Sequence, residues 1–167
     1  MSSDDPASKE TLILPICSKL AFCLYEYEVV NDMVEGWHGD DYVVLFADEE
    51  ASAAASACGF KTALPGFAVL GLRGWQDFIV RDEAGAIFTI PCVPLDTRYL
   101  ASFNLPVPYD LEPDPRLAGK VKWLVKPLIF GGSADAEENV SWVTHQQHRE
   151  LVRWWNEQYR LARTSQT

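Results

Sequence analysis

Apolar residues along the chain follow two periods, one typical of helices and one typical of strands. From Ser18 to Val30 they recur at helical spacing, which predicts a packed helix with an apolar stripe of Leu20, Cys23, Leu24, Tyr27 and Val30. The run from Tyr42 to Phe46 is continuously apolar and too short for a stable helix, so it predicts a buried strand.

A short helix is expected directly after this strand. Asp48 is a good N-cap, and Glu49 and Glu50 suit the positive end of a helix dipole. The alanine-rich run to Ala57 has high helix propensity, and Gly59 can end the helix in the left-handed conformation.

Three apolar segments separated by glycine-containing turns come next. They run from Phe67 to Leu72, from Phe78 to Arg81 and from Ala86 to Ile90. Connections this short join antiparallel neighbours, so the segments predict consecutive strands of a central, mostly antiparallel sheet.

Prolines interrupt the chain between Leu105 and Pro115, which predicts an extended crossing loop. The residues after this loop are too few for an independent core, so no domain boundary is expected there. We expect one domain over residues 11–162, between disordered tails at residues 1–10 and 163–167.

The last elements expected are a strand at Val140–Val143 and a helix that begins after Thr144. Thr144 and Gln147 have the spacing of a capping box. One apolar stripe of this helix should cover a face of the sheet, and it consists of His148, Leu151, Val152, Trp155 and Tyr159. The predicted fold class is therefore α+β, with a central sheet, flanking helices and a C-terminal helix.

The charge of the chain limits its partners. Twenty-four acidic and fourteen basic residues give a formal net charge of −10. This charge repels nucleic acids and anionic membranes. It has two interpretations, a general aid to solubility or a surface complementary to a basic protein.

Candidate catalytic and metal-binding residues are sparse. The four cysteines form no C-x-x-C pair, so they are expected to be buried thiols of a reducing compartment; they are Cys17, Cys23, Cys58 and Cys92. His145 and His148 are three residues apart, a spacing that could hold a metal, but further ligands are missing nearby. We expect no catalytic site, no metal and no cofactor.

The polar and acidic stretch from Met1 to Glu10 does not resemble a signal peptide. No apolar run approaches the roughly twenty residues of a membrane helix. A cytoplasmic protein is therefore expected.

Several motifs resemble the SUKH superfamily, also called the SMI1/KNR4 family. The most specific is the segment from Glu35 to Glu50, which is similar to the family's Glu-Gly turn, apolar strand and acidic helix start. Leu64–Val80 is similar to its Leu-Pro-Gly segment with two glycine-linked strands, and Ile87–Pro91 to the next strand with its proline exit. Leu14–Asp32 is similar to its first motifs, although Asp32 and Met33 stand where glycines are usual.

The resemblance covers about Leu14 to Phe103 and rests on glycine, proline and core positions. It implies an α+β domain of the SMI1/KNR4 type. It also implies an immunity protein that binds and neutralises a cognate toxin of a type VI or contact-dependent secretion system. Many such toxins are basic, which favours the complementary-surface interpretation of the acidity.

Ten residues are candidates for contacts with the toxin. The acidic residues either face a basic partner, or they only begin a helix and lie in a solvated loop. The tryptophans are suited to anchor an interface. The set comprises Trp37, Asp40, Asp41, Asp48, Glu49, Glu50, Asp135, Glu137, Glu138 and Trp154. A regulatory or scaffold protein of the same fold with a housekeeping partner is the alternative function, and an enzyme is the third.

Overall fold

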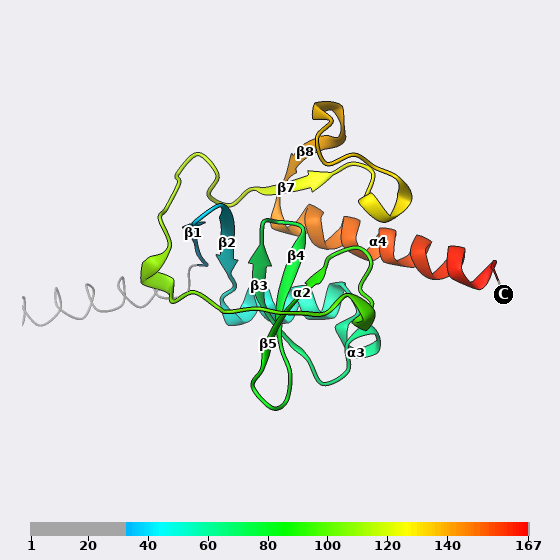
Figure 1. The fold of residues 1–167 in the computed structure, drawn as a ribbon, viewed down its shortest axis with the longest axis horizontal. Coiled ribbons are helices and arrows are strands. Elements are labelled where there is room, and N and C mark those ends of the chain that lie inside the picture. Colours follow the sequence, from blue (N-terminus) through cyan, green and yellow to red (C-terminus); the bar gives the residue numbers. More distant parts are fainter. Residues whose placement is uncertain (1–32, 167) are drawn as a thin grey trace, which may run out of the picture. The chain divides into compact units, whose positions relative to one another are not determined.

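A meander of six antiparallel strands forms the main sheet of the computed structural model (Figure 1), which describes residues 33–166. Each strand pairs with its neighbour in sequence, as short connections require. The strands are β1 (Val34–His38), β2 (Asp41–Leu45), β3 (Ala68–Arg73), β4 (Asp77–Arg81), β5 (Ile87–Pro91) and β6 (Ala101–Ser102). The predicted strands after Phe67 and the strand at Tyr42 are thereby confirmed.

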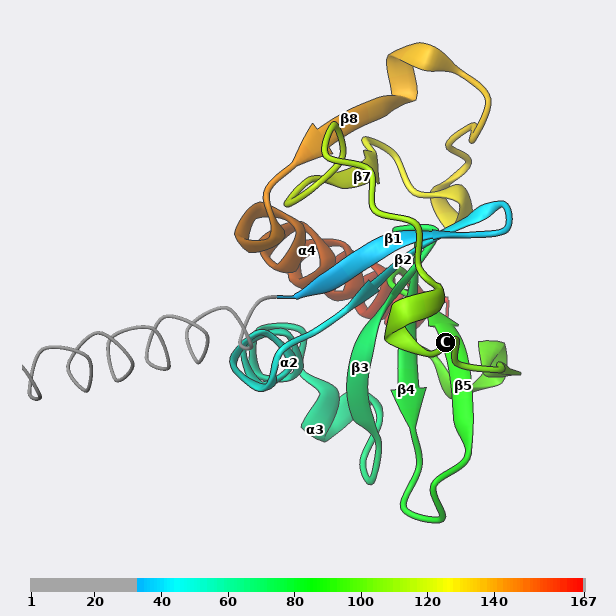
Figure 2. The same cartoon turned by 90° about the vertical axis from the view of Figure 1, so that its left-hand side faces the viewer.

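The other elements pack mainly on one face of this sheet (Figure 2). The helices are α2 (Asp48–Ala57), α3 (Phe60–Ala63) and α4 (His145–Thr164), and β7 (Val121–Leu124) pairs antiparallel with β8 (Val140–Val143). The 3-10 turns are η2 (Thr97–Tyr99), η3 (Pro108–Asp110), η4 (Leu128–Phe130) and η5 (Glu137–Asn139). The described residues form one α+β unit.

The central strands are buried on both faces because each face of the sheet has its own core. Phe78 and Val80 of β4 join the larger core under the helices. Ile79, between them in sequence, packs with Val43 and Leu111 on the opposite face. Leu111 comes from the proline-rich segment, so the predicted crossing loop covers that second face.

Two local predictions were wrong. Glu35 and Gly36 form no turn but lie within β1, and the chain reverses at Gly39, which has φ 61°. Glycine is required at position 36 because a Cβ there would lie 2.6 Å from the carbonyl oxygen of Glu112. The backbone of Glu112 forms an isolated antiparallel bridge with Trp37 of β1. Asp48 is the first residue of α2 rather than its N-cap, because Ala47 occupies that position.

The predicted capping box of the last helix is confirmed. The Thr144 hydroxyl accepts from the Gln147 backbone at 3.1 Å, and the Gln147 side chain accepts from the Thr144 backbone at 3.0 Å. Helix α4 then continues to Thr164, two residues beyond the limit of 162 predicted for the domain. The helix predicted at Ser18–Val30, the tail at 1–10, Cys17, Cys23 and the motifs of Leu14–Asp32 lie outside the described residues.

His148 is the buried polar member of the α4 stripe. It is 1% exposed, its ring lies against Phe78 and Trp123, and its Nε2 atom has no hydrogen-bond partner. Burial lowers its pKa from 6.5 to about 3, with smaller contributions from His145 and Arg149. The imidazole is therefore neutral in the folded protein at physiological pH.

Replacing His148 with leucine should flatten the pH dependence of stability. Between about pH 6.5 and 3 the unfolded chain binds a proton at this imidazole that the folded chain does not. The wild-type free energy of unfolding should therefore fall by several kcal/mol from pH 7 to pH 4. Urea titrations across this range measure it, and His145, present in both proteins, cancels in the comparison. Equal slopes for the two proteins would contradict the assignment.

Candidate functional site

The acidic residues that are close in sequence near β2 do not form one patch. Asp40 and Asp41 lie at the β1–β2 turn, whereas Asp48, Glu49 and Glu50 begin α2 at the opposite end of the strand. A five-residue strand is roughly 16 Å long at about 3.3 Å per residue. Two separate acidic positions therefore flank β2.

Two of these five carboxylates are engaged within the molecule. Arg73 Nε lies 2.9 Å from Asp41 Oδ2. Glu50 forms a largely buried ion pair with Arg149 that joins α2 to α4. Glu50 therefore has a structural role, and the exposed acidic side chains near β2 are those of Asp40, Asp48 and Glu49.

The two predicted tryptophan anchors have different surroundings. Trp154 is exposed on α4, with its ring edge-on to Trp155. Trp37 is partly buried, and its Nε1 donates to Asp114 at 3.3 Å. Its ring packs against Tyr42, with ring centroids 5.3 Å apart. Only Trp154 is available as an anchor in its present conformation.

Trp75 is at the centre of an aromatic cluster that connects the sheet to β8. Its ring stacks on Tyr42 with centroids 4.7 Å apart, and Trp37 and Trp142 meet it edge-on at 6.0 and 5.3 Å. Trp75 has φ 60°, a left-handed backbone conformation that is strained for a bulky residue. Packing around the ring holds the β3–β4 turn in this conformation.

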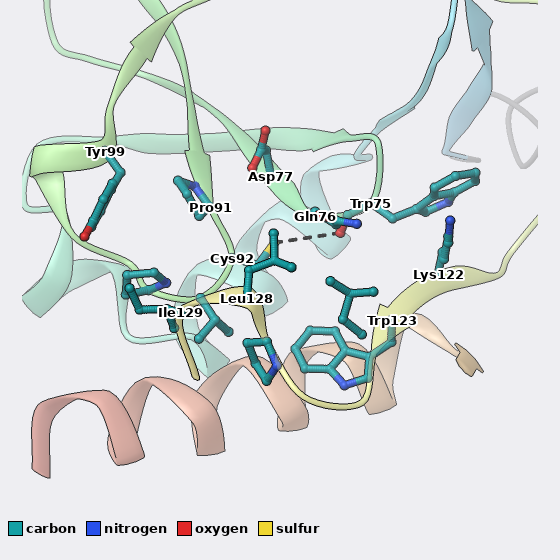
Figure 3. Close-up of a pocket in the computed structure, with 14 residues that line it drawn as sticks. Trp75, Gln76, Asp77, Pro91, Cys92, Tyr99, Lys122, Trp123, Leu128 and Ile129 are labelled. Atoms are coloured by element: carbon teal, nitrogen blue, oxygen red, sulfur yellow. Dashed lines mark hydrogen bonds between the residues drawn. The ribbon is translucent and has the colours of Figure 1, made fainter. Parts of the chain in front are cut away.

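A cavity of about 230 Å³ opens beside Trp75 (Figure 3). Its wall comes from the β3–β4 turn, the end of β5, β7 and η4, and is mainly apolar. In Figure 3 the carboxyl of Asp77 points away from Leu128 and Ile129, and the ammonium of Lys122 lies toward Trp75. The lining residues are Trp75, Gln76, Asp77, Pro91, Cys92, Val93, Pro94, Tyr99, Lys122, Trp123, Leu124, Pro127, Leu128 and Ile129.

Exposed apolar side chains border this cavity. Leu128 is 53% exposed, Ile129 44% and Tyr99 42%, although they are large hydrophobic residues. We call Leu128 and Ile129 the η4 ridge. Exposed apolar residues that gather around a cavity are typical of a binding surface, whereas single ones are ordinary.

The η4 ridge belongs to a connection with a well-defined backbone. The Asn139 side chain accepts from the Lys126 backbone at 2.8 Å and donates to the carbonyls of Lys126 and Ser133 at 3.0 and 2.9 Å. Gly132 packs so tightly that a Cβ there would lie 1.8 Å from the Lys126 carbonyl oxygen. The ridge is thus ordered before any partner binds.

The predicted acidic loop is part of the same β7–β8 connection as the ridge. Asp135, Glu137 and Glu138 are exposed, the last two in η5. The sequence therefore identified the acidic half of this connection and missed the apolar half. The available signal was the apolar run from Pro127 to Phe130 between Lys126 and the polar loop.

The two thiols in the described part of the chain, Cys58 and Cys92, show no sign of nucleophilic activation. Burial raises the pKa of Cys58 to about 12 and that of Cys92 well above its usual value. Thiols in this state are protonated and unreactive. Among residues 33–166, no group of three or more His, Cys, Asp and Glu side chains could hold a metal ion.

A second, wider cleft lies between α2, α3 and the end of α4 and is organised around Asp96. The Asp96 carboxylate lies 2.7 Å from Arg98 Nη2 and 3.1 Å from Arg163 Nη1, and it accepts from the Tyr159 hydroxyl. Arg98 first, and then the Tyr159 hydroxyl, lower the pKa of Asp96 to about 2. The cluster ties the loop after β5 to α4.

No helix in the described part of the chain is both long enough and apolar enough to span a membrane. Comparisons with models of protein families, with curated proteins and with solved structures gave no match for this chain.

Replacing Gly132 with alanine should destabilise the β7–β8 connection. The new methyl group would overlap the Lys126 carbonyl oxygen, so the backbone must shift, at a cost of about 2 kcal/mol. Urea unfolding and hydrogen exchange at the amides of Val125 and Lys126 measure the effect. The neighbouring exposed Ser133→Ala is the control and should cost less than about 1 kcal/mol. Equal stability of the two variants would show that the connection adapts freely.

Proposed function

We propose that the protein is a cytoplasmic immunity protein that binds a cognate interbacterial toxin and neutralises it stoichiometrically. The toxin would be an effector of a type VI or contact-dependent secretion system. The observation that carries the binding role is the ordered, exposed η4 ridge around an apolar cavity. Such surfaces are typical of protein–protein contact.

The SMI1/KNR4-like motifs support the immunity role, and their glycines lie at positions that demand glycine. A Cβ on Gly71 would lie 1.9 Å from the Val44 carbonyl oxygen, and Gly74 has φ 56° in the β3–β4 turn. The motifs therefore encode the close approach of strands and the turn between them. These glycine, proline and core positions specify backbone geometry and packing rather than catalytic groups, which suits inhibition by binding.

The acidity of the chain supports a basic toxin. The net charge is −10, and exposed carboxylates lie at both ends of β2 and on the β7–β8 connection. Such charges accelerate encounter with a positively charged partner. Under this proposal Asp40, Asp48, Glu49 and the acidic loop steer the toxin, while the apolar ridge supplies most of the affinity.

A regulatory or scaffold protein with a housekeeping partner is the second candidate function, because the same ridge would serve it equally well. The gene neighbourhood separates the two. A toxin gene beside this one favours immunity, and its absence favours the scaffold role. Thiol catalysis by Cys58 or Cys92 is not proposed, since burial keeps both of these thiols protonated.

Co-expression with the toxin encoded beside this gene tests the immunity role. The wild-type protein should restore growth and copurify with the toxin in a fixed ratio. A toxin inactivated at its catalytic residue provides the control for growth. Failure of both rescue and copurification would contradict the proposal.

Charge reversal of the acidic loop should slow association with the toxin. The triple variant Asp135→Lys, Glu137→Lys, Glu138→Lys should bind about tenfold more slowly at low ionic strength, with a smaller difference at high salt. The control variant Glu83→Lys, Asp110→Lys, Glu112→Lys makes the same change at other exposed positions. Stopped-flow fluorescence measures both, and equal slowing in both would exclude a local role for the loop.

A further inference from the structure

We infer that the cavity and the η4 ridge take a single apolar side chain of about the size of Phe or Leu, which a protein partner presents beside Lys or Arg residues. This inference rests on the proposed role in protein binding. It adds the chemistry of the partner's contact residue. It does not depend on whether that partner is a toxin.

The volume of the cavity favours one side chain over a small-molecule ligand. The cavity holds about 230 Å³, whereas ligand pockets usually hold roughly 300–1,000 Å³. Its inner wall contains Trp75, Cys92 and Trp123, all of which are buried. An inserted apolar group would therefore lose its contact with water, which is the condition for a binding hot spot.

The order of the surrounding backbone reduces the cost of binding. Asn139 fixes Lys126 and Ser133 on either side of the ridge, and Gly131 ends η4 in the left-handed conformation with φ 85°. The neighbouring Phe130 ring packs on Trp155 with centroids 4.8 Å apart. Little conformational entropy remains to be lost when a partner docks on this ridge.

The charges around the cavity select the residues that flank the inserted side chain. The β7–β8 connection carries the carboxylates of Asp135, Glu137 and Glu138 and a single basic residue, Lys126. At the opposite border, Asp41 pairs with Arg73 at 2.9 Å, and the cavity wall contains one acidic and one basic residue, Asp77 and Lys122. The charges at this border balance, so the net negative side of the apolar centre is the β7–β8 connection. A partner that inserts an apolar side chain gains most if it places cations beside this connection.

Short peptides test this chemistry without knowledge of the partner. The first peptide has one phenylalanine between pairs of lysines; the second replaces phenylalanine with alanine, and the third replaces the lysines with glutamates. In nuclear magnetic resonance titrations of the full chain, the first should shift the indole N–H signals of Trp75 and Trp123 at millimolar concentration. The other two should bind at least tenfold more weakly. Equal shifts by all three peptides, or none by the first, would overturn the inference.

Leu128→Asp tests the ridge, with Leu161→Asp as a matched control. Both leucines are similarly exposed, at 53% and 54%, but Leu161 lies on α4 and does not line the cavity. Leu128→Asp should abolish the peptide-induced shifts and weaken binding of a neutralised toxin roughly thirtyfold. Leu161→Asp should leave both unchanged. Because both sites are exposed, neither variant should unfold the protein.

The outcomes separate this inference from the immunity proposal. If the peptide binds at the cavity but the neighbouring toxin is not neutralised, the immunity proposal fails and the inference stands. If Leu128→Asp changes neither the peptide-induced shifts nor the neutralisation of the toxin, the inference fails and immunity stands. A wild-type dimer that Leu128→Asp converts to a monomer would show that a second copy covers the cavity, and would also overturn the inference.

Discussion

The packing of Trp75 between the main sheet and the β7–β8 pair is the interaction on which the rest of the structure depends. Its ring stacks on Tyr42 of β2 and meets Trp142 of β8 edge-on. The same residue forms the β3–β4 turn with a positive φ and lines the cavity. A strained backbone held by surrounding packing is common at functional sites, because the fold must specify it from several directions.

The molecule divides its tasks between two sheets. The central strands of the six-stranded sheet are buried on both faces, and its glycines permit close backbone contacts, so this sheet serves as the scaffold. The connection between β7 and β8 displays the apolar ridge and the acidic loop. A rigid scaffold with an ordered, chemically distinctive connection fits a protein that recognises another protein by its surface.

Most of the fold beyond Met33 could be predicted from the sequence, because hydrophobic period and turn residues are local signals. The strand at Tyr42, the three glycine-linked strands and the capping box at Thr144 all belong to this class. Gly36 was assigned to a turn, but it is a glycine because the backbone of Glu112 approaches it closely. A glycine with either cause looks the same in the sequence. Local reasoning cannot distinguish these two causes.

The sequence by itself determined the α+β class, the three consecutive antiparallel strands after Phe67, the buried face of α4 and the acidic character of the chain. Only the tertiary structure decided which charged and apolar side chains are available. In the folded protein Glu50 is paired with Arg149, and Trp37 packs in the aromatic cluster. Leu128 and Ile129 remain exposed around a cavity. The reason is physical: periodicity and propensity act over a few residues, whereas burial and pairing depend on segments that are distant in sequence.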